Sequence, residues 1–383
     1  MRKFSCIWGL ACFIFLWLPA TAALAETPEP VITAESAILI EASTGRVIYE
    51  KQADKRLYPA SMTKMMTCLL AERALGARHD VIISQNAAET EDIPLEFAQN
   101  DVFLSGELIR GMMLASDNGA AVALAEASAG SVADFVAQMN SEAKKIGMTD
   151  THFANPNGLT NPDHYSTAAD MAKLARYAMQ EKSFREIVGT AQAVIHWELP
   201  RGETRLEKNT NELLTTYSGA TGIKTGWTEA AGGCLAASAR RGGLELICIV
   251  MKSATPADRF QDARKILDYG FAETKLVQGI KKENFRKSIW VKGGKQGKTA
   301  LHPVTDVNFP LIHGEDAKGY TIRYDLPKIL PAPLKKNEPV GQMVLQYDGK
   351  EVGRVDMVVD PVEQGTSFSS LMVGIFGWLL PRL

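Results

Sequence analysis

Cysteine is scarce in this sequence, and its placement argues against both a disulfide scaffold and a metal site. Two of the five cysteines, Cys6 and Cys12, fall in the apolar stretch at the N-terminus. The other three, Cys68, Cys234 and Cys248, lie in apolar runs and share no Cys-x-x-Cys spacing. We therefore expect buried free thiols, with oxidation of one pair as the alternative.

The sequence also lacks the patterns that hold metals, nucleotides and nucleic acids. Its six histidines show no His-x-x-x-His or comparable spacing, so we predict no metal and no cofactor. With 42 basic and 44 acidic residues and no long basic run, nucleic acid is not an expected partner. The glycine-rich segment from Lys292 to Thr299 has a lysine where a phosphate-binding loop requires its first glycine, so it predicts a hairpin turn.

Both ends of the chain carry a short apolar stretch, and the one at the C-terminus is too short to cross a bilayer as an ordinary helix, which needs about 20 residues. At the N-terminus two basic residues precede an apolar stretch from Cys6 to Leu18, and Ala23-Leu24-Ala25 follows. This pattern predicts a secretory signal peptide over residues 1–25, with an uncleaved anchor as the alternative. We expect an exported protein whose mature chain begins at Glu26.

At the C-terminus, residues 366–383 hold an apolar stretch with Phe376 and Trp378 and a single charge, Arg382. The alternatives are an amphipathic helix lying in a membrane interface and a strand or helix docked on the protein. We favour the first, which makes the membrane surface a partner. The expected location is the outer face of the cytoplasmic membrane.

The apolar pattern predicts an α/β domain over residues 26–272. Residues 36–51 alternate as in a β-hairpin, and residues 87–180 are mostly helical. Three strands and a helix follow, at 223–227, 233–239, 244–251 and 256–269. Because strands stand at both ends of a helical insert, we expect a single sheet assembled from the two ends of the domain. We also expect Ser105 to cap a helix and Ser84 to cap a strand.

Beyond this domain the pattern of apolar and polar residues changes. Residues 280–362 consist of short alternating stretches interrupted by Gly and Pro. This pattern predicts a small all-β domain, and it contains no chemical motif.

The segment Pro59-Ala60-Ser61-Met62-Thr63-Lys64 predicts the first turns of a buried helix. Ser61 and Lys64, three residues apart, would then be neighbours on its surface. A serine hydroxyl becomes a nucleophile when a base takes its proton, and a lysine amine can be that base when burial lowers its pKa. The same spacing at Ser141 and Lys144 falls in a polar helical segment and indicates a solvated face.

Two further motifs follow in the order that this chemistry requires. Ser116-Asp117-Asn118 lies between two predicted helices, and Lys224-Thr225-Gly226 lies on a predicted strand. Together with Ser61 and Lys64, they make the chain resemble the serine penicillin-recognising enzymes. The likeness is greatest to the low-molecular-weight D-alanyl-D-alanine carboxypeptidases. It covers nearly all of the mature chain and also includes Asn155-Pro156-Asn157-Gly158-Leu159 and Asp268-Tyr269-Gly270-Phe271.

The resemblance implies a β-lactamase/transpeptidase-like fold and roles for the first two motifs. Ser61 would attack the carbonyl between two D-alanines of a peptidoglycan stem peptide and form an ester. Lys64, kept neutral by burial and by the nearby Lys224, would be the general base. Ser116 would pass a proton to the departing D-alanine, and Asn118 would hold Lys64 and the substrate amide.

The third motif, by the same resemblance, would bind the substrate. Lys224 and Thr225 would meet its terminal carboxylate, while Gly226 would leave room for the peptide to pair with the strand. The backbone N–H groups of Ser61 and Trp227 would form an oxyanion hole. The implied partners are the stem peptide and β-lactam inhibitors.

Two departures from the family pattern affect substrate binding. Trp227 stands where some relatives have His, which leaves the preference for the leaving group open. Asn209-Thr210-Asn211 lacks a basic residue that some relatives carry before Leu213. We therefore expect carboxylate binding to depend on Lys224, Thr225 and Arg259, which matches a family position that can assist.

Three rival functions remain open from the residues. A β-lactamase would need a carboxylate for fast deacylation, as in Glu-x-x-x-Asn, and no such run stands between Asn118 and Lys224. The second rival is a peptidoglycan-binding or sensing protein that only forms a slow β-lactam adduct, and the intact Ser61, Lys64 and Lys224 argue against such a loss of chemistry. Endopeptidase action on cross-links is compatible with the same residues.

Overall fold

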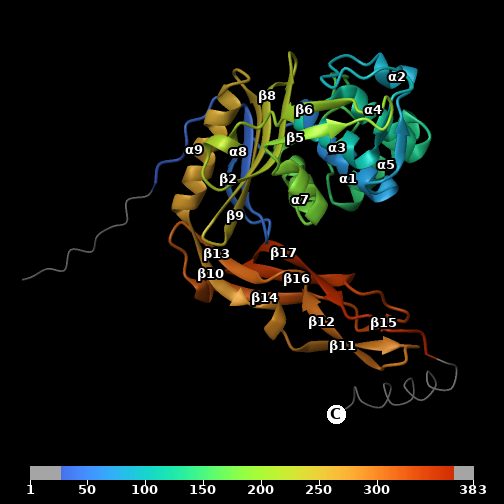
Figure 1. Ribbon diagram of the computed structural model, residues 1–383. Helices are drawn as coiled ribbons and strands as arrows, with labels where there is room; N and C mark the ends of the chain where they lie inside the picture. The colour runs from blue at the N-terminus through green and yellow to red at the C-terminus, as the bar shows by residue number, and fades with distance from the viewer. Residues whose placement is uncertain (1–26, 366–383) are drawn as a thin grey trace, which may run out of the picture.

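The computed structural model describes residues 27–365. The predicted signal peptide, residues 1–25, and the predicted membrane segment, residues 366–383, lie outside these residues. Figure 1 shows an α/β body joined to a β-rich body, which lies below it in that view.

A five-stranded antiparallel sheet forms the centre of the α/β body and takes its strands from both ends of that region, as predicted. Its order is β2-β1-β9-β8-β7, with β1 (Ser36–Glu41), β2 (Val47–Lys51), β7 (Ala220–Thr228), β8 (Gly232–Arg241) and β9 (Leu244–Ser253). β1 and β2 are the predicted hairpin. β9 pairs with β1, placing Ser36 opposite Met251 and Glu41 opposite Leu246. β7 is an edge strand.

Both faces of the sheet are buried. On β1, Ile38 and Ile40 pack into one hydrophobic cluster, whereas Ala37 and Leu39 pack into another. Successive side chains of a strand point to opposite faces, so the two clusters are the cores above and below the sheet. This explains why the strands are nearly continuous apolar runs.

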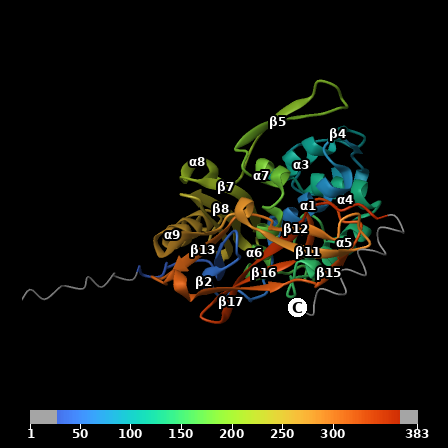
Figure 2. The ribbon, with the colours of Figure 1, turned by 90° about the horizontal axis from the view of Figure 1, so that it is seen from below.

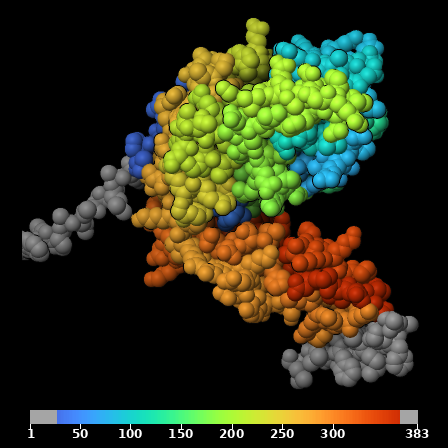
Figure 3. Space-filling view, in the orientation of Figure 1, coloured from blue at the N-terminus to red at the C-terminus, as the bar shows by residue number. Residues whose placement is uncertain are grey.

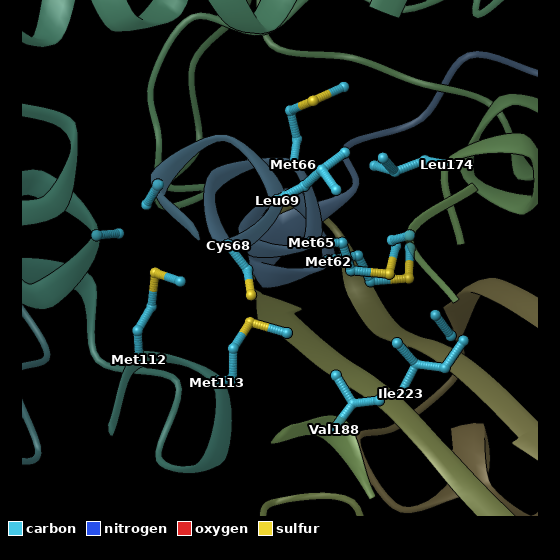
Figure 4. Packing of buried hydrophobic residues seen from close by; sticks show 14 of the residues in the cluster. Met62, Met65, Met66, Cys68, Leu69, Met112, Met113, Leu174, Val188 and Ile223 are labelled. Carbon is cyan, nitrogen blue, oxygen red and sulfur yellow. The ribbon is translucent and has the colours of Figure 1, made fainter. Parts of the chain in front are cut away.

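Helices cover both faces of the sheet. The long helix α9 (Asp258–Glu273) packs on β8 and β9 from one side, and α6 (Ala168–Ala178) packs on β1 and β9 within the other cluster. The remaining helices are α1 (Lys64–Leu75), α2 (Gln85–Ala88), α3 (Ser105–Leu114), α4 (Asn118–Ala129), α5 (Val132–Lys145), α7 (Lys182–Val188) and α8 (Leu213–Thr216). In Figure 4, Met62, in the turn before α1, and Met65 of α1 extend toward Ile223 of β7, and Met113 approaches Cys68. α1 is therefore wedged between the sheet and the helical layer.

Two short hairpins complete the α/β body. β3 (Asp80–Ile82) pairs with β4 (Val102–Leu104), and β5 (Gln192–His196) pairs with β6 (Thr204–Lys208). The second hairpin projects from the body in Figure 2 and was not predicted. Most of its side chains are at least partly exposed, so it lacks the apolar alternation that marks a half-buried strand.

Two predicted caps were wrong. Ser84 does not cap a strand; its side chain accepts a hydrogen bond from the Ala87 N–H at the start of α2. The cap of α3 is Leu104, and the hydroxyl of Ser105, inside the helix, donates to the Gly76 carbonyl. Serine satisfies several kinds of local backbone group, so its position alone does not decide which one.

The β-rich body contains two sheets, in agreement with the predicted all-β region. β10 (Thr274–Ile280) pairs with β13 (Val307–Ile312). The other sheet has the order β14-β16-β17-β12-β11-β15, with β11 (Lys287–Lys292), β12 (Lys298–Pro303), β14 (Tyr320–Asp325), β15 (Ile329–Pro331), β16 (Glu338–Tyr347) and β17 (Lys350–Val359). β11 and β12 form the hairpin predicted for the glycine-rich segment after Lys292.

The two bodies meet at the turn of the β1–β2 hairpin, and they abut in the space-filling view (Figure 3). Arg46 donates to the Pro310 carbonyl at 2.6 Å and pairs with Glu315. Arg176 donates to the carbonyl of Ser43 at 2.6 Å and to that of Arg354 at 2.8 Å. Two arginines thus tie the α/β body to the β-rich body.

Two further observations bear on the composition arguments. Cys68, Cys234 and Cys248 are buried free thiols, as predicted. Within residues 27–365 no single helix is long and apolar enough to span a membrane, although α4 and α5 pass such a test as a pair bent by 86°.

Candidate active site

The Ser61 turn stands at the mouth of a cavity of about 610 Å³ between β7 and the helical layer. A short 3₁₀ turn, Ala60–Thr63, leads into α1, and Lys64 is the first residue of that helix. Lys64 Nζ lies 2.8 Å from Ser61 Oγ. The three-residue spacing therefore places the amine against the hydroxyl.

Lys64 is fully buried and makes two further contacts. Its Nζ donates to Asn118 Oδ1 at 2.6 Å and to the Asn157 carbonyl at 2.7 Å. Burial lowers the pKa of Lys64 to about 7, and the nearby carboxylates of Asp117 and Asp92 oppose this shift.

We expected the charge of Lys224 to help keep Lys64 neutral, but burial is the cause of the Lys64 shift. Lys224 itself has its pKa lowered well below the usual value, first by burial and then by Lys64 and Arg259. The two lysines share one wall, so protonation of either disfavours protonation of the other.

The second motif sits in the turn between α3 and α4. Ser116 lines the cavity in a left-handed conformation with φ of 67°. Asp117 is buried and caps α4 by accepting from the Ala120 N–H at 2.7 Å; it also accepts from the Leu95 N–H at 2.9 Å. Burial raises the pKa of Asp117 to about 6. The Asn118 amide is oriented by donating to the Glu91 carbonyl at 3.0 Å.

The third motif forms the edge of the sheet beside Ser61. The hydroxyl of Thr225 lines the cavity and is 2.6 Å from that of Thr210. Lys224 is buried behind it and donates to the Thr225 carbonyl at 3.1 Å. A Cβ at Gly226 would lie 3.1 Å from the backbone nitrogen of Ser61, so glycine permits the close approach of β7.

Arg259 and Trp227 complete the lining. Arg259, on α9, donates from Nη1 to the Gly226 carbonyl at 2.8 Å. Its Nε is buried and has no hydrogen-bond partner among the described residues. The Trp227 side chain is 46% exposed at the mouth. All nine residues selected from the sequence therefore lie in or directly behind this one cavity wall.

The loop that closes the site above α1 was identified in the sequence as a turn and as part of the family resemblance, without a role in the site. Gly158 has φ of 91°, and a Cβ there would lie 2.0 Å from the Ala60 carbonyl oxygen. His164 is buried and holds this loop against the Ser61 turn. Its Nδ1 accepts from the Ala154 N–H at 3.1 Å, which leaves Nε2 to donate to Thr63 Oγ1 at 2.8 Å. Burial lowers the pKa of His164 to about 4, so the ring is neutral.

Sequence reasoning missed the contacts of Asn157 and His164 for identifiable reasons. Asn157 acts through its backbone carbonyl, which every residue possesses. His164 was considered only for metal spacing. Within residues 27–365 no group of three or more His, Cys, Asp or Glu side chains is placed to hold a metal ion.

Comparison with known protein families identifies both bodies. The family model described as D-alanyl-D-alanine carboxypeptidase matches residues 22–255, and that described as penicillin-binding protein 5, C-terminal domain, matches residues 273–363. The chain belongs to the D-alanyl-D-alanine carboxypeptidase family. Its activity is therefore that of a serine-type carboxypeptidase acting in the cell wall, and its fold is the transpeptidase-like α/β fold with a C-terminal β domain.

Individual relatives of this carboxypeptidase span most of its length. It is 34% identical over 330 residues to D-alanyl-D-alanine carboxypeptidase DacF of Bacillus subtilis, covering 85% of this chain and 84% of the relative. It is 32% identical over 385 residues to DacC of Escherichia coli, covering 95% and 94%. A crystal structure of penicillin-binding protein 5 from Haemophilus influenzae matches with a TM-score of 0.67 and 29% identity, covering 88% of this chain and all of that chain.

The buried neutral His164 predicts a specific pH dependence of stability. Its pKa is about 4 in the folded protein against 6.5 as the ordinary value, so the unfolded chain binds the extra proton between these pH values. Stability should therefore fall as the pH drops from 6.5 to 4, by up to about 3 kcal/mol from this residue. Thermal unfolding of the wild type and of His164→Gln across this range should show a shallower fall in Tm for the variant.

The difference between the wild type and His164→Gln reports the contribution of His164 alone, because Asp117 and the other groups titrate in both. Equal slopes for wild type and variant would contradict a buried neutral imidazole.

Proposed function

We propose that this carboxypeptidase removes the terminal D-alanine of stem pentapeptides through an ester on Ser61, with Lys64 as the general base. The observation that carries the proposal is the set of three contacts around Lys64 Nζ. A neutral amine has two N–H bonds and one lone pair. Asn118 Oδ1 and the Asn157 carbonyl can only accept, so they take the two N–H bonds and leave the lone pair facing the Ser61 hydroxyl.

The proposed reaction proceeds in two halves. Ser61 Oγ attacks the scissile carbonyl as its proton passes to Lys64, and the oxyanion is held by the N–H groups of Ser61 and Trp227. The proton then reaches the leaving nitrogen through Ser116, which lines the same cavity. The carbon–nitrogen bond breaks and D-alanine departs. Water hydrolyses the ester in the second half, with Lys64 as the first candidate for its base.

The substrate carboxylate is proposed to bind between β7 and α9. The Thr225 hydroxyl faces the cavity, and Arg259 supplies the buried Nε that has no partner among the described residues. Lys224 lies behind Thr225. The negative charge of the arriving carboxylate favours the ammonium form of this buried amine, so Lys224 adds a positive charge when the substrate is bound. Asn118 is proposed to hold the amide of the substrate as well as Lys64.

The nucleophile can be tested with a control that this chain supplies. Ser61→Ala should lower D-alanine release from a stem pentapeptide by at least about a thousandfold and abolish labelling by a fluorescent penicillin. Ser141→Ala, the other serine with a lysine three residues on, should leave both unchanged. Release that survives in Ser61→Ala would contradict the proposal. A wild-type protein that is labelled but releases no D-alanine would be a sensor, and rapid turnover of penicillin would make it a β-lactamase.

The pKa of Lys64 predicts the pH profile of acylation. With a pKa of about 7 and a neutral active form, the second-order rate constant for labelling of Ser61 should fall about tenfold per pH unit below pH 7 and be level above it. Lys64→Met should lose at least about a hundredfold at pH 8. A rate constant that does not change between pH 5.5 and 8.5 would exclude Lys64 as the base.

We also propose that the chain is exported and held at the outer face of the cytoplasmic membrane by residues 366–383. The support is the sequence of the two termini, together with a cell-wall substrate. Deleting residues 366–383 should move the protein from the membrane fraction to the soluble fraction, whereas Ser61→Ala should remain with the membranes. A truncated protein that still sediments with membranes would rule out this anchor.

A further inference from the structure

A second cavity, of about 540 Å³, adjoins the active-site cavity and shares Trp227 and Glu229 with it. It lies where β2, β7 and β9 end and β8 begins. We call it the sheet-end groove; its polar lining includes Glu35, Lys51, Gln52, Glu229 and Lys252. Apart from the backbone N–H of Trp227, nothing in the proposed chemistry at Ser61 uses this groove.

The direction of the substrate along β7 brings its remaining part to this groove. If the terminal carboxylate lies at Thr225 and the scissile carbonyl lies by the N–H of Trp227, the rest of the stem must leave past Thr228 and Glu229. A strand advances about 3.3 Å per residue. The third residue of the stem, one before the penultimate D-alanine, therefore falls at the boundary between the two cavities.

The groove offers three different chemical surfaces at this point. The half-exposed indole of Trp227 is a wall on which methylene groups can pack. Glu229 places an exposed carboxylate next to that wall. On the far side Lys252 pairs with Glu35 at 2.8 Å, and Lys55 pairs with the same carboxylate. Two ammonium groups share one carboxylate there, which leaves an excess of positive charge.

We propose that the sheet-end groove is the subsite for the third residue of the stem, and that it selects a diamino acid whose side chain ends in both an ammonium and a carboxylate. This inference rests on the acyl transfer at Ser61 proposed above. The methylene chain packs on Trp227, the ammonium meets Glu229, and the terminal carboxylate meets Lys252. Lys51 serves the fold, because its amine donates to the carbonyls of Ile32 and Ala34.

Two substrates test the contribution of the carboxylate at the end of the third residue's side chain. Stem pentapeptides with diaminopimelate or with lysine at the third position differ there by one carboxylate. We expect the wild type to release D-alanine from the diaminopimelate peptide with a kcat/KM about fivefold higher. Lys252→Met should lower kcat/KM for the diaminopimelate peptide and leave that for the lysine peptide unchanged. The ratio should then be about one. Glu229→Gln should lower kcat/KM for both peptides by a similar factor, because both carry the ammonium.

Lys182→Met is the matched control, since Lys182 is 91% exposed on α7, and it should keep the wild-type ratio. The ratio of two substrates measured on one preparation does not depend on how much of a variant is folded. A wild-type ratio of one, or a fivefold ratio that persists in Lys252→Met, would overturn the subsite. If the wild type released D-alanine from neither peptide, the proposed reaction at Ser61 itself would be overturned.

Discussion

The buried amine of Lys64 sets the conditions that the rest of the active site has to meet. In a dry interior its charged form is disfavoured, yet each of its N–H groups still requires an acceptor. The three partners come from three separate segments: the Ser61 turn, the start of α4 at Asn118, and the loop at Asn157. None of these segments can move without leaving a buried polar group unpaired. The amine therefore fixes the relative positions of a turn, a helix and a loop.

The close approach of these segments explains the backbone around Ser61. Gly158 packs on the Ala60 carbonyl from one side, and Gly226 packs on the Ser61 nitrogen from the other. Ala60 and Ser116 adopt φ values of 47° and 67°, which cost on the order of 1 kcal/mol each or more for residues with a Cβ. Such conformations persist only where the surroundings determine them. The doubly buried sheet and the wedged helix α1 supply that rigidity, since Ala60 and Met62 of the turn pack in the same hydrophobic cluster as α1 and one face of the sheet.

The sequence was informative where function depends on side chains at fixed spacing and less so where it depends on the backbone. Ser61 and Lys64 are one helical turn apart, so their contact followed from spacing, and the sheet followed from apolar strand segments at both ends of the domain. The Asn157 carbonyl has no signature, because any residue supplies one. Arg259 was predicted at the site only through the resemblance, since an arginine on a helix is usually exposed; it is partly buried because α9 covers the sheet next to β7. The β5–β6 hairpin was not predicted, because an exposed hairpin needs no apolar pattern.

The distribution of charge in the cavity wall favours a ligand with a negatively charged end. Lys64, Lys224 and Arg259 converge there, and burial lowers the pKa of each of them. Asp117 and Asp92 offset this near Lys64, and Glu212 offsets it in part near Arg259. A peptide that ends in a free carboxylate supplies one negative charge at the Lys224 and Arg259 side and a partner for Arg259 Nε. A peptide whose end is amidated supplies no charge to favour the ammonium form of Lys224 and no counter-charge for Arg259. A terminal carboxylate is thus favoured by the protein's own electrostatics, independently of the chemistry at Ser61.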